Sequence, residues 1–294
     1  MWLCPIIALA AARRQCPLTV CALALSWARN RPPESGITGL GAEDLSVALC
    51  KAEAITIRLT DFSETSQIAW FYTREFGRLS ALAKGSKRQR SNFDGRLDLL
   101  CHNEIVFARK TRTTLHVLTE CRLLDRFMGL RAGVDRLYAA LYAAELVREM
   151  TPAEESQPQV FELLLTTLRA LSAGEDVART LLAFEARLLA LTGYAPMLGA
   201  CVACQSGQLP AGTVAYSSAL GGVLCRACRA RDPKSVGVPR AALAALGQLA
   251  DGSAANANAA DARLPQALVS VLRKLMKATF THHLNREPKL MRYV

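Results

Sequence analysis

The sequence is short of acidic residues: 25 Asp and Glu stand against 36 Lys and Arg, which gives a formal net charge of +11 at pH 7. This deficit favours an anionic partner, which could be nucleic acid, an acidic protein or a membrane surface. A basic surface without any partner is the alternative. Residues 131–193 are net acidic, whereas residues 51–130, 194–240 and 261–294 are net basic. We therefore expect localised basic patches.

Long apolar runs are missing. Residues 3–12 and 16–28 are apolar, but each run is shorter than the ~20 residues that a membrane-spanning helix needs, and Arg13 and Arg14 separate them. A secretory signal would carry its positive charges before the first apolar run, not after it. We expect no targeting signal and a cytoplasmic protein, with a membrane anchor as the weaker alternative.

Catalytic motifs are missing as well. None of the 4 histidines belongs to a His-Glu-x-x-His pair, and the sequence contains neither a Gly-x-Ser-x-Gly elbow nor a Walker loop. Asp61, Glu64 and Glu75 are neighbours in sequence, but nothing indicates a pair of carboxylates tuned for acid–base catalysis. We expect that the protein is not an enzyme and has no small-molecule substrate.

The segment from Lys51 to Leu130 has the pattern of short strands. Residues 53–59 alternate, with Ile55 and Ile57 on one face and Ala54, Thr56 and Arg58 on the other. Residues 66–85 predict two strands around a turn that ends at Gly77, which can take the positive φ of a hairpin. About five short strands in this segment predict a small closed β-barrel of the OB or SH3-like kind.

From Arg131 onward the apolar period is helical. The pattern predicts helices over residues 133–150, 159–174, 175–193, 239–249 and 264–284. We expect an α+β chain with three parts: residues 1–50 are a disordered or mis-annotated N-terminal extension, 51–130 a nucleic-acid-binding barrel, and 131–294 a mostly α-helical domain with an inserted zinc segment at 194–232.

That insertion contains two Cys-x-x-Cys pairs, Cys201/Cys204 and Cys225/Cys228, with 20 residues between the inner cysteines. Each pair forms a tight turn that directs two thiolates to one point, and this spacing is typical of a four-thiolate zinc site. We therefore predict one structural Zn²⁺ per chain. A redox-active pair and a disulfide framework are the alternatives.

Two basic segments lie in the barrel. The loop after the predicted hairpin carries Lys84, Lys87, Arg88 and Arg90, and the turn between the next two strands carries Arg109, Lys110 and Arg112. Long cationic side chains on flexible loops can follow a phosphate backbone, so we expect these seven residues to bind DNA from one rim of the barrel. Plain solvated turns are the alternative.

The aromatic residues of the barrel divide into two groups. We expect Phe93 to be exposed and to stack on bases. We expect the others to be core residues: Phe62, Trp70, Phe71 and Phe76.

Four short motifs occur in order along residues 51–100: an opening strand, an acidic turn, a Tyr-Thr-x-x-x-Gly-Arg segment and an Ala-Lys-Gly loop. They occupy Ala54–Arg58, Asp61–Glu64, Tyr72–Arg78 and Ala83–Arg88. In this combination they resemble RecO, a bacterial family of recombination mediators in DNA repair. Residues 189–196, which lead into Cys201, are similar to the family too, and the resemblance covers residues 51–294.

This resemblance implies an N-terminal OB-fold barrel, a helical domain with a zinc-binding segment and no catalytic chemistry. It further implies binding to single- and double-stranded DNA, annealing of complementary strands, and work with RecR and the single-strand-binding protein that helps to load RecA. The setting would be nucleoid DNA. Among the basic residues it carries over Lys84, Lys87 and Arg88. The main alternative is a zinc-stapled protein-interaction scaffold that does not bind DNA directly.

Residues 1–50 depart from the family pattern, because the resemblance begins near Lys51. No methionine occurs between Met1 and Met128. Our hypothesis is that translation begins at a non-ATG codon near Leu45, Val47 or Leu49. The intact mass of the natively expressed protein tests it, and a mass that corresponds to Met1 onward would contradict it.

Overall fold

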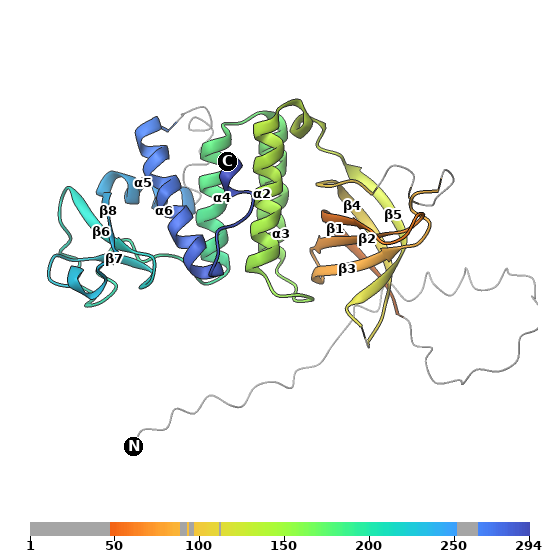
Figure 1. Ribbon diagram of the computed structural model, residues 1–294, viewed down its shortest axis with the longest axis horizontal. Coiled ribbons are helices and arrows are strands. Elements are labelled where there is room, and N and C mark those ends of the chain that lie inside the picture. Colours follow the sequence, from red (N-terminus) through yellow and green to blue (C-terminus); the bar gives the residue numbers. More distant parts are fainter. Residues whose placement is uncertain (1–47, 89–92, 94–96, 112, 252–263) are drawn as a thin grey trace, which may run out of the picture. The chain divides into compact units, whose positions relative to one another are not determined.

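The computed structural model describes residues 48–88, 93, 97–111, 113–251 and 264–294 (Figure 1). Two of the predicted DNA-binding residues, Arg90 and Arg112, lie outside these residues, and so does the predicted extension up to residue 47. The barrel and the helices described below belong to one compact unit that runs from Ser46 to Val294.

Five strands close into a barrel (Figure 1). Their order around the barrel is β1-β2-β3-β5-β4, in which β3 and β5 are parallel and the other neighbours are antiparallel. A five-stranded Greek-key barrel of this kind is OB-like and confirms the predicted fold class. The strands are β1 (Ala48–Asp61), β2 (Gln67–Thr73), β3 (Gly77–Ala83), β4 (His102–Arg109) and β5 (Leu115–Asp125).

The predicted hairpin is formed by β2 and β3. Gly77 has φ +64° at the turn, and the Thr73 hydroxyl donates to the Gly77 carbonyl over 2.9 Å while it accepts from the N–H of Phe76 over 3.1 Å. The prediction that Gly77 supplies the positive φ of this turn is therefore confirmed.

The helical part follows the barrel and begins with a short 3₁₀ turn. Gly174 (φ +91°) ends the second long helix and Gly193 (φ +82°) follows the third, as the sequence predicts for left-handed C-terminal glycines. The elements are η1 (Met128–Ala132), α2 (Val134–Met150), α3 (Pro158–Ala173), α4 (Val177–Leu191), α5 (Arg240–Asp251), α6 (Gln266–Leu284) and η4 (Met291–Tyr293).

Between α4 and α5 the chain forms a small sheet of order β7-β6-β8, composed of β6 (Thr213–Ser217), β7 (Gly222–Leu224) and β8 (Val236–Pro239). A 3₁₀ turn, η2 (Arg229–Arg231), lies between β7 and β8. The sheet is joined to α6 by a buried hydrogen bond of 3.0 Å between the hydroxyls of Tyr216 and Thr279.

Strand β1 is buried on both faces. Ala52 and Ala54 lie in the barrel core, whereas Ile55 and Ile57 belong to the same buried cluster as the apolar residues of the helices. The helices α2 and α3 contact β1 and β2. The predicted alternation is thus present, but tertiary packing makes the outer face apolar as well as the inner one.

The connection between α2 and α3 docks on the β2–β3 hairpin. Ala153 forms a parallel bridge with Arg78, and the N–H of Glu154 donates to the Arg78 carbonyl over 2.9 Å. The Ser156 hydroxyl donates to the Arg74 carbonyl over 2.9 Å. Backbone contacts therefore hold the helical part to this end of the barrel.

In the part of the chain that the structure describes, no helix combines the length and the apolar character that crossing a membrane requires.

We expect two buried histidines, His102 and His116, to make the stability of the fold depend on pH. Burial lowers the pKa of His102 and His116 below the usual 6.5, although Glu53 and Glu154 respectively oppose this effect. Below pH 6.5 the unfolded chain therefore binds protons that the folded chain does not, so stability should fall as the pH drops from 6.5 towards 5. Thermal melts across this range measure the effect. The His116→Gln variant should show a shallower dependence, and an unchanged slope would contradict this cause.

Candidate metal centre and nucleic-acid interface

The four cysteines of the two Cys-x-x-Cys pairs meet at one point. The sulfur atoms of Cys201, Cys204, Cys225 and Cys228 all lie within 4.8 Å of one another, and the Cys204 and Cys225 Sγ atoms are 3.8 Å apart. All four are free thiols, and three of them are buried while Cys204 is exposed. The predicted cluster is therefore present, and it is not a pair of disulfides.

Backbone hydrogen bonds shape the two turns that present these thiols. The N–H of Gln205, a residue with φ +61°, donates to the Cys201 carbonyl over 2.8 Å. The N–H of Cys228 donates to the Cys225 carbonyl over 3.1 Å. Cys225 directly follows β7, so the small sheet sets the position of the second turn relative to the first.

The thiols cannot all ionise by themselves. Burial works to raise the pKa of Cys201, but N–H groups of Cys225, Ala203 and Cys204 lower it to about 6. Hydrogen bonding to Cys225, together with burial, raises the pKa of Cys228 to about 12. A divalent cation removes this conflict, because it stabilises every thiolate that it binds. Four sulfur donors in a closed arrangement suit a soft or borderline ion, so the cluster could hold a metal ion.

The rest of this segment has little core of its own. A separate small cluster of buried residues consists of three of the four cysteines and two apolar side chains: Cys201, Ala215, Leu224, Cys225 and Cys228. A core this small does not by itself fix a fold, and natural small domains compensate with a metal or disulfides. The sulfur cluster is thus the main cross-link of the segment.

The first basic loop follows β3 and packs against the β1–β2 turn. The N–H of Lys87 donates to the Thr65 carbonyl over 3.1 Å, and Lys87 Nζ lies 2.6 Å from the carboxylate of Asp61. The ammonium group of Lys87 lowers the pKa of Asp61. Lys84 and Arg88 are exposed and form no ion pair with any residue that the structure describes. Two cations of this loop are therefore available to an anion.

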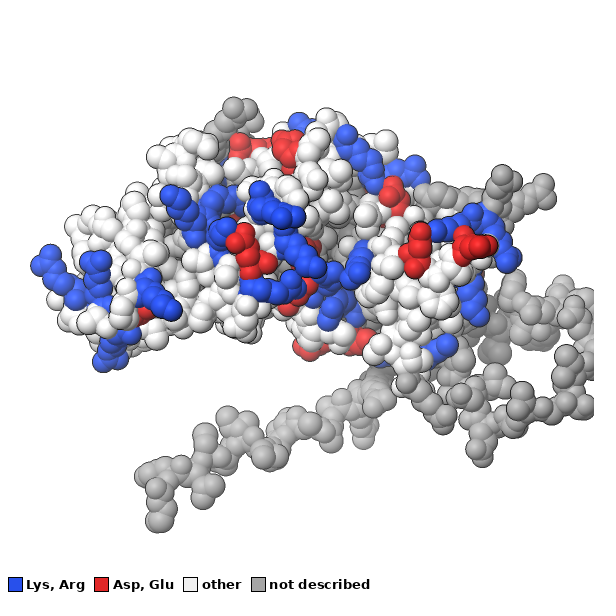
Figure 2. Space-filling model, in the orientation of Figure 1, with Lys and Arg blue, Asp and Glu red and all other residues white. Residues whose placement is uncertain are grey.

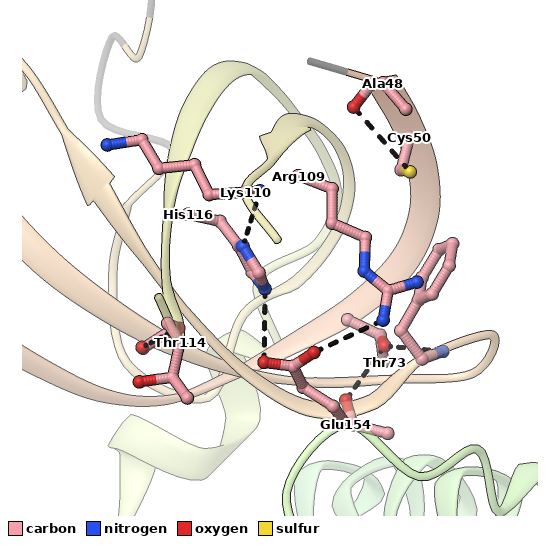
Figure 3. Close-up of polar contacts among 11 residues, drawn as sticks. Ala48, Cys50, Thr73, Arg109, Lys110, Thr114, His116 and Glu154 are labelled. Atoms are coloured by element: carbon pink, nitrogen blue, oxygen red, sulfur yellow. Dashed lines mark hydrogen bonds and ion pairs between the residues drawn. The ribbon is translucent and has the colours of Figure 1, made fainter. Parts of the chain in front are cut away.

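The second basic turn, between β4 and β5, is already engaged by an acidic residue (Figure 3). Arg109 lies 3.3 Å from the Glu154 carboxylate, and His116 Nε2 lies 3.5 Å from its other oxygen. The N–H of Lys110 donates to His116 Nδ1 over 3.3 Å, so the neutral ring points its Nε2–H at Glu154. Arg109 is thus partly neutralised, while the side chain of Lys110 is exposed.

These two basic segments lie at opposite ends of the barrel, and the expectation of one shared rim is wrong. In the parallel pairing of β3 with β5, Ser80 is opposite Leu115 and Ala83 opposite Leu118, so the β4–β5 turn lies at the N-terminal end of β3. The loop that starts at Lys84 lies at the other end. Between Ser80, which is opposite the first residue of β5, and Lys84 the chain advances about 13 Å, at ~3.3 Å per residue.

The aromatic residues are also distributed differently from the prediction. Phe93 is buried in the barrel core with an exposed fraction of 5%, whereas Phe62 is 59% exposed. Trp70 is half-buried, and the guanidinium carbon of Arg58 lies 4.8 Å from the centre of its ring. Phe62 and the Arg58–Trp70 pair, rather than Phe93, are therefore the aromatic groups that face solvent.

Arg58 is a residue that sequence reasoning missed. Strict alternation would place it inside the barrel with Ala54 and Thr56, but a bulge between Thr56 and Arg58 shifts the register and turns Arg58 outward. The only signal of this bulge in the sequence was a charged residue, Arg58, on the same face as Ala54 and Thr56.

Two family models match the chain. The model described as Recombination protein O N terminal matches residues 47–127, and the model described as Recombination protein O C terminal matches residues 131–292. The matched residues therefore include the barrel, the helices and the four clustered cysteines.

Individual relatives agree with the family models. The chain is 37% identical over 198 residues to the DNA repair protein RecO of Rhodopirellula baltica, which covers 67% of this chain and 73% of that protein. It is 33% identical over 244 residues to the DNA repair protein RecO of Roseiflexus sp., which covers 83% and 84%. It is 32% identical over 244 residues to the DNA repair protein RecO of Desulforudis audaxviator, which covers 83% of this chain and 95% of that protein.

Proposed function

Because this chain belongs to the RecO family of DNA-repair proteins, we propose that it is a DNA-binding recombination mediator of the RecF pathway. The family is not enzymatic, which agrees with the lack of a catalytic motif. In this proposal the protein works on nucleoid DNA in the cytoplasm and anneals complementary strands. With RecR, it helps to load RecA onto single-stranded DNA that is coated by the single-strand-binding protein.

The observation that carries DNA binding is the end of the OB-like barrel beyond β3. Lys84 and Arg88 are exposed there, and the β1–β2 turn beside them presents the exposed ring of Phe62. Cations that are free to reach phosphates, next to an aromatic surface, are the features that OB folds use on single strands. We assign Lys87 to the same surface, and Arg109 and Lys110 to a weaker second contact at the other end. Arg90 and Arg112, which lie outside the described residues, are proposed as DNA contacts from the sequence alone.

We propose that residues 51–130 bind nucleic acid and that residues 131–294 carry the contacts to partner proteins, with the segment 194–232 held by one structural Zn²⁺. The four sulfur donors support zinc, which binds thiolates. Because the four of them leave no open coordination position for catalysis, we propose a structural role for the ion.

Salt titration of DNA binding tests the proposal. For direct phosphate contact, the logarithm of affinity should fall linearly with the logarithm of salt, at ~0.7 per neutralised phosphate on single strands and ~0.9 on duplex DNA. Fluorescence anisotropy with labelled oligonucleotides measures this, and a strand-annealing assay tests the activity. If the protein binds no DNA at low salt, the scaffold alternative holds instead.

The two basic segments should contribute unequally. We expect the Lys84→Ala/Arg88→Ala variant to lose about 1.4 from the single-strand salt slope, since two phosphate contacts of ~0.7 each are removed. Arg109→Ala should change the slope less, because Arg109 is already paired with Glu154 at 3.3 Å. A loss of about 0.7 in Arg109→Ala, the full value for one phosphate contact, would show that the Glu154 pairing does not matter.

A further inference from the structure

The ten residues after α6, which we call the strap (285–294), run back along α2. Arg286 lies 2.7 Å from the Glu149 carboxylate near the end of α2. The backbone N–H groups of residues 289–290 donate to the two oxygens of Glu145 over 3.0 and 2.9 Å. These contacts proceed towards the N-terminus of α2 as the strap proceeds towards residue 294, so the strap lies antiparallel to the helix.

At its far end the strap contributes one ring of a stacked pair of tyrosines, and α2 contributes the other. The rings of Tyr138, on α2, and Tyr293, on the strap, have centroids 4.7 Å apart and an interplanar angle of 21°. Tyr293 is 47% exposed, and the Arg292 guanidinium carbon lies 4.8 Å from the centre of its ring. Tyr138 thus covers one face of the Tyr293 ring and the Arg292 guanidinium lies over the other, in a part of the strap that is open to solvent.

The carboxylates near the strap are already used. Glu145 is buried and accepts the two backbone N–H groups, and Glu149 is held by both Arg148 and Arg286. Burial works to raise the pKa of Glu149, but hydrogen bonds from the two arginines lower it. Glu287 pairs with Lys277 of α6 at 2.8 Å.

Several cations on the same part of the molecule have no such partner. Lys274, on the exposed side of α6 one turn before Lys277, and Lys289 and Arg292 of the strap are all exposed. None of the three forms an ion pair with a residue in the described ranges. Figure 2 shows Lys and Arg side chains gathered over α6 and the segment that follows it. This surface therefore has a net positive charge that the chain itself does not balance.

We propose that the strap and the exposed side of α6 form a second binding surface for single-stranded nucleic acid. In this inference, which rests on the proposed DNA binding, Lys274, Lys289 and Arg292 contact phosphates. When Arg292 leaves the ring of Tyr293 to contact a phosphate, a base takes its place and stacks on that face of the Tyr138–Tyr293 pair, as bases do on aromatic side chains of single-strand-binding proteins. Phosphates and bases occur together along a single strand and match the cations and the aromatic pair, whereas a purely acidic peptide would use only the cations; the combination therefore favours nucleic acid.

Binding of labelled oligothymidine to the full-length chain tests this surface. We expect Lys289→Ala/Arg292→Ala to reduce the single-strand salt slope by about 1.4, since each lost phosphate contact removes ~0.7. Tyr293→Ala should weaken binding about tenfold, within the range measured for the loss of one stacked base, and Tyr293→Phe should restore it. Arg229→Ala/Arg231→Ala removes the same charge from the exposed η2 turn and should have little effect.

Photo-crosslinking locates the contact and is independent of variant stability. An oligothymidine that carries 5-bromouracil should form an adduct on Tyr138 or Tyr293 in the wild-type protein. Adducts only on the barrel, or equal losses in the strap and η2 variants, would overturn the inference while leaving the proposed function intact. If the wild-type protein does not bind the oligonucleotide at all, the proposed function fails and this inference fails with it.

Discussion

Removal of the proposed zinc ion from the four-cysteine cluster is expected to unfold residues 194–239 before the rest of the chain. The segment's own buried cluster contains only two apolar residues besides three cysteines. Structural zinc contributes about 10–16 kcal/mol to the folding of small zinc domains at neutral pH, so without it the segment would keep only its contacts with the helices. Elemental analysis should find one zinc per chain. Hydrogen exchange after chelation should show lost protection in β6, β7 and β8.

Chelation of the ion should also destabilise the helices but not the barrel. Val214, Tyr216 and Val223 of the small sheet belong to the same buried cluster as the helices, whereas the barrel core is a separate cluster. We therefore expect a lower melting temperature of the helical part and unchanged protection in β2–β5. Cys225→Ser should reproduce the effect of the chelator.

Cys50→Ser, which changes a thiol outside the cluster, is the matched control and should leave the zinc content unchanged. Full protection of β6–β8 in the metal-free protein would contradict a structural role for the ion.

Gly77→Ala is expected to destabilise the protein by about 3 kcal/mol, because two costs add. Gly77 has φ +64°, a conformation that costs an L-residue ~1–2 kcal/mol. An added Cβ would also overlap the carbonyl group of Glu155 in the α2–α3 connection, and overpacking of this kind costs about 1–3 kcal/mol. Thermal unfolding should show a fall of about 10 °C for a chain of this size.

Gly85→Ala is the matched control. Gly85 has a similar φ of +69°, but a Cβ there would meet only the flexible side chain of Arg88, at 3.4 Å. This variant should lose only the conformational cost, about 1 kcal/mol or ~3 °C. If the two variants melted at the same temperature, close packing of the hairpin against the α2–α3 connection would not contribute to stability.

Local patterns in the sequence were enough to predict the elements and the four-cysteine cluster. The hairpin prediction needed only the apolar alternation and Gly77, and the helix ends at Gly174 and Gly193 needed only glycines after apolar periods. The thiol cluster followed from two Cys-x-x-Cys pairs, since each tight turn brings its two sulfurs together over three residues. Such features depend on neighbours in sequence, and they are confirmed.

The proposed DNA-binding surface depends on more than neighbours in sequence. Its two basic segments were expected on one rim, but the parallel pairing of β3 with β5 places them at opposite ends. Phe62 and Phe93 exchange their expected roles, because burial depends on which residues fill the barrel and not on residue type. Pairing register and packing, which join distant residues, decide both outcomes.

By itself, then, the sequence determined the α+β organisation, a small β-barrel with helices after it, and the meeting of Cys201, Cys204, Cys225 and Cys228. Each of these follows from short-range periodicity and spacing. Only the tertiary structure decided which cations are free. Glu154 engages Arg109, Asp61 engages Lys87, and Glu149 engages Arg286, while Lys84, Arg88 and Lys289 have no ion pair in the described part of the chain. The reason is physical: whether a charge is neutralised depends on contacts over a few ångströms, and folding brings those partners from distant parts of the chain.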